Sequence, residues 1–224
     1  TFGVSLGYGK RLNWPDDYFS FYGELSYQMY MMKDWPYMIL TDGTSHNFAL
    51  NFQLSRSSID NPIYTRRGSQ FTLGLKITPP YSLIKGTTDA QYAQMTSSEK
   101  YNLLEYHKWR FSGKVFTPLS ADSKLVLMAR AEFGYLGHYN KNAKSPFESF
   151  YMGGDGMSSY SSYSTEYISM RGYQSGSLTP YDPAVGRNMG YVYNKFTMEL
   201  RYPISLEQNA TIWALAFVEA GNCF

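Results

Sequence analysis

The sequence predicts an all-β protein that crosses a membrane as an antiparallel β-barrel, and two features of its 224 residues support this prediction. The first is composition, because 18% of the residues are aromatic while the mean hydropathy is −0.39. A transmembrane barrel explains both values, because aromatic girdles line its two membrane interfaces while its lumen is polar and only its outer face is apolar. The second is a series of segments in which apolar and polar residues alternate with the two-residue period of a strand. No apolar run approaches the roughly 18 residues of a transmembrane helix.

The first four predicted strands lie in the N-terminal third of the chain. They cover residues 1–10, 19–31, 47–55 and 70–78. The segment 19–31 is long enough to cross hydrocarbon as a tilted strand, which takes about 9–11 residues. In 47–55 and 70–78 the polar positions include Asn, Gln and Lys, which suit water better than a dry core. Proline and glycine mark turns at 15–17 and 60–68.

Four further strands follow, which brings the predicted total to about eight. They cover residues 108–119, 125–135, 196–202 and 211–221. Residues 79–106 are predicted to form a long loop with a short helix at 97–104, whereas 120–123 form a tight turn. The last strand, 211–221, is apolar on both faces, so its sequence alone does not decide which side chains face lipid.

The connections between these strands are short at one end of the sheet and longer at the other, as in outer-membrane barrels. An open sheet of about eight strands would leave two unpaired edges, which lipid does not tolerate. Both ends of the sequence break off within a strand pattern. The eight strands therefore either close on themselves or are completed by further strands, and the broken patterns favour the second alternative. We expect residues 1–224 to be part of one outer-membrane β-barrel domain, a fragment that other strands complete.

Several classes of function are not supported by the sequence. The net charge of +2 is spread over interspersed acids and bases, without the basic stripe of a nucleic-acid-binding protein. Cys223 is the single cysteine, and His46, His107 and His138 lack the spacing of metal ligands. No Ser/His/Asp grouping has a supporting context, and Gly153–Gly156 lacks the Lys-Ser/Thr ending of a phosphate-binding loop. We therefore expect no enzyme activity, no metal and no cofactor.

The stretch from Phe150 to Pro180 is the most informative connection. It contains the pair Gly153-Gly154, a Ser/Tyr-rich run at 158–164 that we expect to be solvated, and then Met170-Arg171-Gly172-Tyr173. Long connections in a strand-rich domain are usually functional or disordered. A compact group of a cation, a glycine and an aromatic residue is not typical of a disordered linker, so we interpret the stretch as functional.

Groups of residues along the whole chain resemble the BamA/TamA outer-membrane assembly family. The groups within 150–180 are similar to the family's sixth-loop motif, and the group at 60–68 is similar to the turn before its tenth strand. The groups at 202–204 and 216–221 are similar to its thirteenth and fourteenth strands. The resemblance implies that the chain spans roughly the seventh to fourteenth strands of a barrel of about sixteen, with loop 150–180 folded inward. One departure is that Met157 to Ile168 separate the glycine pair from the arginine. The groups are Phe150-Tyr151-Met152-Gly153-Gly154, Met170-Arg171-Gly172-Tyr173, Leu178-Thr179-Pro180, Asp60…Pro62…Gly68, Tyr202-Pro203-Ile204 and Ala216-Phe217-Val218-Glu219-Ala220-Gly221.

The resemblance also implies a site, because in this family the loop arginine is held by acidic residues of the inner wall. Matched by motif, the arginine is Arg171 and the acids are Glu199 and Glu219. A guanidinium suits this role since it is planar, always charged and able to bind carboxylates with two hydrogen bonds. Alternation with Thr197 and Arg201 directs Glu199 inward. The direction of Glu219 stays open, because Phe217 would share its face and a bulge would change the phase.

The function implied by the resemblance is the folding and insertion of β-barrel proteins into the bacterial outer membrane. The expected partners are outer-membrane lipids, unfolded β-barrel substrates and accessory lipoproteins. Two alternatives remain open at this stage. One is a two-partner-secretion translocation pore of the same superfamily, and the other is a passive porin in which the motifs occur by chance.

Overall fold

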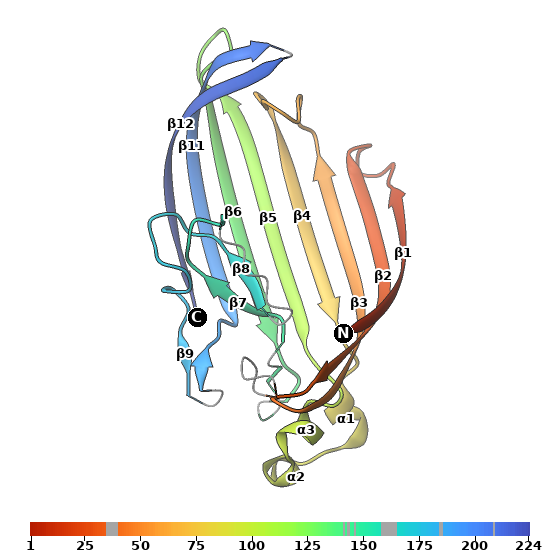
Figure 1. The fold of residues 1–224 in the computed structure, drawn as a ribbon. Helices are drawn as coiled ribbons and strands as arrows, with labels where there is room; N and C mark the ends of the chain where they lie inside the picture. The colour runs from red at the N-terminus through yellow and green to blue at the C-terminus, as the bar shows by residue number, and fades with distance from the viewer. Residues whose placement is uncertain are drawn as a thin grey trace.

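The computed structural model describes residues 1–34, 40–140, 142, 144–145, 147–157, 165–183, 186–207 and 209–224. One antiparallel sheet of eight strands dominates the chain and is strongly curved (Figure 1). Neighbouring strands of the sheet are consecutive in the sequence except for β6 and β11, which pair although the connection 138–191 separates them. The all-β class and the set of eight strands are thus confirmed. In spatial order the strands are β1 (Phe2–Arg11), β2 (Phe19–Met32), β3 (Gly43–Ser57), β4 (Gly68–Ile77), β5 (His107–Pro118), β6 (Val126–Gly137), β11 (Val192–Glu207) and β12 (Ala210–Cys223).

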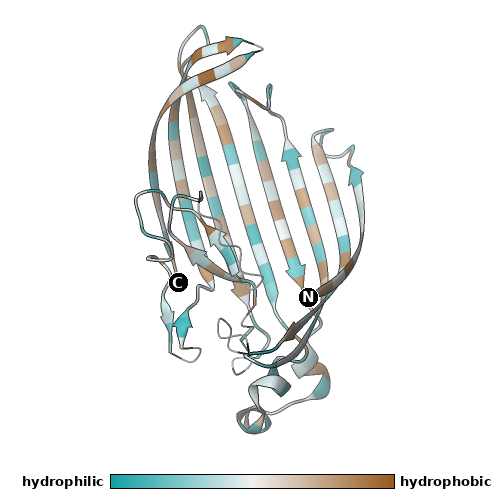
Figure 2. Ribbon diagram, in the orientation of Figure 1, coloured by the Kyte–Doolittle hydropathy of each residue, from teal (hydrophilic) through white to brown (hydrophobic). Residues whose placement is uncertain are grey.

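The two faces of this sheet are reversed relative to those of a soluble protein. On β11 the apolar side chains of Phe196, Met198 and Leu200 are exposed on the outer face, while Thr197 and Glu199 between them are buried on the inner face. Figure 2 shows the same alternation of apolar and polar bands along the other strands. Apolar side chains are stable on such a surface when lipid covers it. The pattern is that of a membrane strand.

The two ends of the sheet differ in their connections. At the short-turn end the strands are joined by residues 12–18, 58–67, 119–125 and 208–209. At the long-loop end they are joined by 33–42, 78–106 and 138–191, and the helices lie at this end (Figure 1). No described helix has the length and apolar character that a membrane crossing requires. The predicted asymmetry between the two ends is therefore present.

The connection 78–106 contains more helix than the sequence predicts. It forms α1 (Tyr81–Lys85), α2 (Asp89–Gln94) and α3 (Ser97–Lys100). The helix expected at 97–104 is wrong in its C-terminal half. The backbone N–H of His46 on β3 donates to the carbonyl of Asn102, and the N–H of Leu104 donates to the carbonyl of His46. This long-range pairing with β3 competes with the helix and ends it after one turn.

The connection 138–191 folds back along the inner face of the sheet (Figure 1). It contains a short parallel pair, β7 (Ser149–Met152) and β8 (Thr165–Ile168), and a small hairpin, β9 (Tyr181–Asp182) with β10 (Arg187–Asn188). Its apolar residues complete a buried cluster with the wall. Members of this cluster include Tyr30, Leu136, Phe147, Phe150, Met152, Met170 and Tyr193. At the long-loop end the described part of this connection therefore packs against the inner face of the wall.

A second buried cluster lies near the short-turn end of β5, β6 and β12. The turn 58–67 inserts Tyr64 against Val126, Met128 and Trp213, and the Tyr64 hydroxyl donates to the carbonyls of Lys124 and Arg201. Because these bonds join the turn 58–67 to the turn 119–125 and to β11, Tyr64→Phe is expected to lower the free energy of unfolding by about 1 kcal/mol.

Urea unfolding of the full-length protein in lipid measures this difference. Tyr202→Phe is the matched control, since Tyr202 lies on the exposed outer face beside Arg201 and is 50% exposed. An equal effect of the two substitutions would contradict a role for the Tyr64 hydroxyl.

Candidate functional site

Arg171 lies on the inner wall between two glutamates of adjacent strands. Its Nη2 atom is 2.8 Å from Glu219 Oε1 and 3.3 Å from Glu199 Oε1. Its backbone N–H donates to the other oxygen of Glu219 at 3.0 Å. The guanidinium also lies 3.4 Å from the ring centroid of Phe217, in cation–π geometry. Main chain and side chain of one residue are thus held by the same carboxylate.

The register of β11 and β12 explains how the two glutamates meet. Glu199 pairs with Phe217, and Glu219 pairs with Thr197, so both carboxylates project into the lumen from neighbouring positions. The direction of Glu219, which the sequence leaves open, is inward, with 3% of its side chain exposed. Val218 next to it is 71% exposed on the outer face. Paired positions of adjacent strands lie on the same face, which gives Arg171 two carboxylates within reach.

Two further cations belong to this site and were not singled out from the sequence. The Nζ atom of Lys195 lies 3.3 Å from Glu219 Oε1 and donates to the carbonyl of Ser169. Arg201 Nη2 lies 2.6 Å from Glu199 Oε2. Positions 195, 199 and 201 share one face of β11, so alternation is the signal that places both cations in the lumen. The site therefore combines three cations with two carboxylates.

Exposure decides which of these contacts carry most of the stability. The side chains of Lys195 and Glu219 are each 3% exposed, whereas that of Arg171 is 31% exposed. A partly solvated ion pair contributes little, while removing one partner of a buried pair leaves an uncompensated charge. We therefore regard Glu219 as the anchor of the site and Arg171 as the group that joins the loop to it.

The other residues of the motif around Arg171 have distinct positions. Met170 is 1% exposed and packs in the buried cluster, while Tyr173 is 49% exposed and uses its carbonyl as an acceptor for Gly154 N–H. Gly172 has a φ of +88°, and no atom lies within 4 Å of an added Cβ. A side chain at Gly172 would therefore be disfavoured by backbone conformation and not by lack of space.

The glycine pair lies beside Arg171 in space despite its distance along the chain. The N–H of Met170 donates to the carbonyl of Gly154 at 2.8 Å, and the N–H of Gly154 donates to the carbonyl of Tyr173 at 3.1 Å. Gly153 has a φ of +131°, and a Cβ there would lie 2.3 Å from the carbonyl oxygen of Gln174. These bonds join the glycine pair to the segment around Arg171, so the departure from the family spacing does not separate the two motifs in space.

The group Leu178-Thr179-Pro180 is hydrogen-bonded to Met152, the residue that precedes the glycine pair. The Thr179 hydroxyl accepts a hydrogen bond from Met152 N–H at 2.8 Å, and Leu178 N–H donates to the Met152 carbonyl at 3.2 Å. The Ser/Tyr-rich run at 158–164, which we expect to be solvated, lies outside the described residues. In the described part of the chain, no group of three or more His, Cys, Asp or Glu side chains could hold a metal ion.

The fold and this site define a class of protein: part of a membrane β-barrel whose long loop is held against the inner wall by charged contacts. The chain belongs to the Omp85 superfamily, because the Omp85 superfamily domain matches residues 1–224. The expected family relationship and the location in the bacterial outer membrane are thereby confirmed.

Among solved structures, the chain is similar to the crystal structure of BamA from Haemophilus ducreyi lacking POTRA domains 1–3. The TM-score is 0.66 at 18% sequence identity, and the match covers 99% of this chain and 41% of that chain. A likeness at this identity shows the fold. A comparison with curated proteins gave no match.

Proposed function

We propose that the chain is the wall and the bracing loop of an assembly factor that folds and inserts β-barrel proteins into the bacterial outer membrane. The observation that carries the proposal is Arg171 held between Glu199 and Glu219 inside a membrane sheet. Membership of the Omp85 superfamily supports it further. In this proposal the eight strands correspond to roughly the seventh to fourteenth of a barrel of about sixteen, and loop 150–180 is part of the same domain.

The proposed mechanism requires no bound nucleotide or other energy-supplying ligand. Substrate strands would pair with an exposed strand edge at a seam between the first and last strands of the complete barrel, as in other cases of strand addition. The loop, fixed to the wall through Arg171, would keep that wall rigid while the seam opens. The outer face contacts membrane lipid, and the further partners we propose are unfolded β-barrel substrates and accessory lipoproteins. No enzyme activity, cofactor or nucleic acid enters the mechanism.

Reconstitution of the full-length protein in lipid vesicles tests this function. We expect it to accelerate the folding of an added, urea-unfolded β-barrel protein relative to empty vesicles, as measured by the slower gel migration of unfolded barrels or by protease resistance. Vesicles carrying an unrelated barrel of similar size are the control.

Two other outcomes would each contradict the proposal. Passage of one soluble partner across the membrane without faster barrel folding would indicate a secretion pore. A large, steady single-channel conductance without faster barrel folding would indicate a passive porin.

A further inference from the structure

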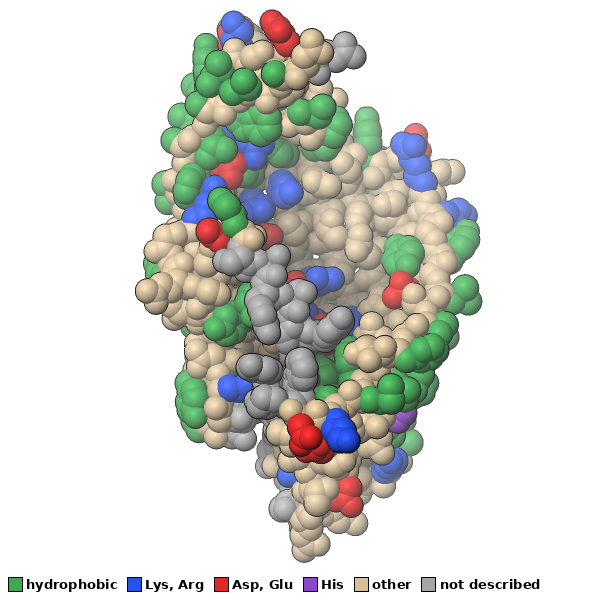
Figure 3. Space-filling view, viewed as in Figure 1, with side chains coloured by type: hydrophobic (Ala, Val, Ile, Leu, Met, Phe, Trp, Pro, Cys, Tyr) green, Lys and Arg blue, Asp and Glu red, His purple; other side chains and the backbone are tan. Residues whose placement is uncertain are grey.

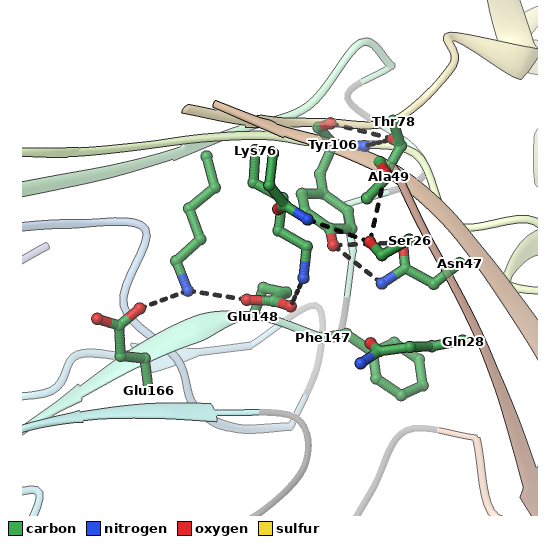
Figure 4. A network of polar contacts seen from close by, with 12 residues as sticks. Ser26, Gln28, Asn47, Ala49, Lys76, Thr78, Tyr106, Phe147, Glu148 and Glu166 are labelled. Atoms are coloured by element: carbon green, nitrogen blue, oxygen red, sulfur yellow. Dashed lines mark hydrogen bonds and ion pairs between the residues drawn. The ribbon is translucent and has the colours of Figure 1, made fainter. Parts of the chain in front are cut away.

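A second group of charged contacts joins the loop to the wall at β4 and β5, on the other side of β6 from Arg171. Glu148 directly precedes β7, and its carboxylate binds Lys76 of β4 and Lys108 of β5. Glu166 of β8 binds Lys108 and Arg110 of β5. Figure 4 shows Glu148 and Glu166 projecting from the loop toward this part of the wall. We name Lys76, Lys108, Arg110, Glu148 and Glu166 the lysine clamp.

Lys108 is the centre of the lysine clamp. Its Nζ atom lies 3.0 Å from Glu148 Oε2 and 2.7 Å from Glu166 Oε2, and its side chain is 3% exposed. The same ammonium lies 4.8 Å from the ring centroid of Phe150, the most buried aromatic residue of β7. Among the described contacts, Lys76 binds Glu148 but not Glu166. Arg110, whose side chain is 55% exposed, binds Glu166 but not Glu148. Lys108 alone in the described clamp therefore touches both.

The ionisation of Glu148 is consistent with a strong contact. Burial raises its pKa, but the nearby charges of Lys108 and Lys76 outweigh burial and lower the pKa to about 2. The carboxylate is therefore charged at neutral pH, and a buried charge of this kind is stable only while its partners stay in place. Figure 3 shows basic and acidic side chains inside the hollow of the sheet.

The two short strands of the loop need such a contact. β7 and β8 have four residues each and pair in parallel, with Phe150 opposite Glu166. Parallel pairing requires a long crossover connection, and a two-stranded pair of this length is not stable on its own. Lys108 binds one carboxylate beside β7 and one on β8, so a single wall residue holds the two strands in register.

We propose that Lys108 is a positioning residue, which aligns β7 with β8 and fixes this half of the loop to β4 and β5 independently of Arg171. Besides the buried apolar cluster, the described part of the loop then has two groups of charged contacts with the wall, the lysine clamp on β4 and β5 and the Arg171 site on β11 and β12. Breaking one charged group leaves the other in place, so each holds its own part of the loop against the wall. This inference goes beyond the proposed function and does not rest on it, since it concerns local opening of the loop.

Hydrogen exchange of the full-length protein in lipid nanodiscs tests the proposal segment by segment. For Lys108→Met we expect amide exchange in 149–153 and 165–168 to accelerate by about tenfold or more, because two carboxylates lose their buried partner. The readout includes Gly153 N–H, which donates to the Ile168 carbonyl across the pair. For Arg171→Ala we expect acceleration at 169–173, while 149–152 stay protected.

Matched variants separate positioning from general loss of structure. Lys114→Met changes the same residue type on the same face of β5, opposite Gln70 and Arg130, and should leave the loop protected. Lys108→Arg keeps the charge and should keep most of the protection. If Lys108→Met does not assemble, Glu166→Gln replaces it, and exchange should then rise in β8 more than in β7 because Glu148 keeps its contact with Lys108.

Two results would overturn the proposal. The first is a loop that is equally protected in Lys108→Met and Lys114→Met, or, where Glu166→Gln is used, equally affected in β7 and β8. The second is that Lys108→Met and Arg171→Ala release the same segments to the same extent.

Discussion

Arg171→Ala is expected to release the loop tip from the wall and, under the function proposed above, to reduce barrel assembly strongly in cells that depend on this protein. The substitution removes the side-chain bonds to Glu199 and Glu219 and the contact with the Phe217 ring. Bonds to charged groups contribute about 1.5–3 kcal/mol when buried, and partial exposure of Arg171 reduces this to about 1–2 kcal/mol, or about tenfold in the released population. The amount of folded outer-membrane barrels in such cells measures the result.

Two variants accompany this prediction. Arg171→Lys keeps the charge without the planar fork, so we expect an intermediate defect. Arg67→Ala removes an exposed arginine from the turn 58–67 at the other end of the sheet, where it bonds to Ser123, and should have no effect on assembly. Normal barrel levels in the Arg171→Ala strain, together with normal protection of the loop from protease, would rule out the bracing role.

Glu219→Gln is expected to destabilise the barrel more than Glu199→Gln. Loss of the Glu219 charge leaves Lys195 buried at 3% side-chain exposure without its carboxylate, and it also weakens both contacts of Arg171. Breaking a truly buried pair costs about 3–5 kcal/mol, and a partly wet lumen places the expected loss somewhat below that range. Loss of the Glu199 charge is milder, because Arg171 keeps Glu219 and because Arg201 is more exposed than Lys195.

Urea unfolding of the full-length protein measures both losses. A double variant, Glu219→Gln with Lys195→Met, provides the internal control, since removing both members of a buried pair leaves no unpaired charge. We expect the double variant to be more stable than Glu219→Gln alone, which would show the two sites to be coupled. Equal losses for Glu199→Gln and Glu219→Gln, or simple additivity in the double variant, would contradict the assignment of Glu219 as the anchor.

The fold was predictable because alternation is a local signal. Each membrane strand exposes one apolar face to lipid, so residues such as Phe196, Met198 and Leu200 reveal β11 and direct Glu199 inward without knowledge of its neighbours. The helix in 97–104 was only partly predictable, because the competing bonds of Asn102 and Leu104 come from His46, which is far away in the sequence.

The site was predictable in part, and its limits have a physical cause. The combination of Arg171 with two glutamates came from the family resemblance, and nothing in their spacing brings residues 171, 199 and 219 together. The direction of Glu219 needs the register of β12 on β11, which an apolar strand with two similar faces does not reveal. The lysine clamp was missed because Glu148 and Glu166 lie in a long connection whose path depends on tertiary contacts.

The most direct test of the central claim is the exchange rate of one amide, the backbone N–H of Arg171, in the full-length protein in lipid. This group donates to Glu219 Oε2 at 3.0 Å, so it reports the contact between loop and wall while every side chain is intact. We predict slow exchange in the unmodified protein, fast exchange in Glu219→Ala and unchanged exchange in Val218→Ala, whose side chain faces lipid. Fast exchange of this amide in the unmodified protein would contradict a loop held in the lumen by the barrel wall.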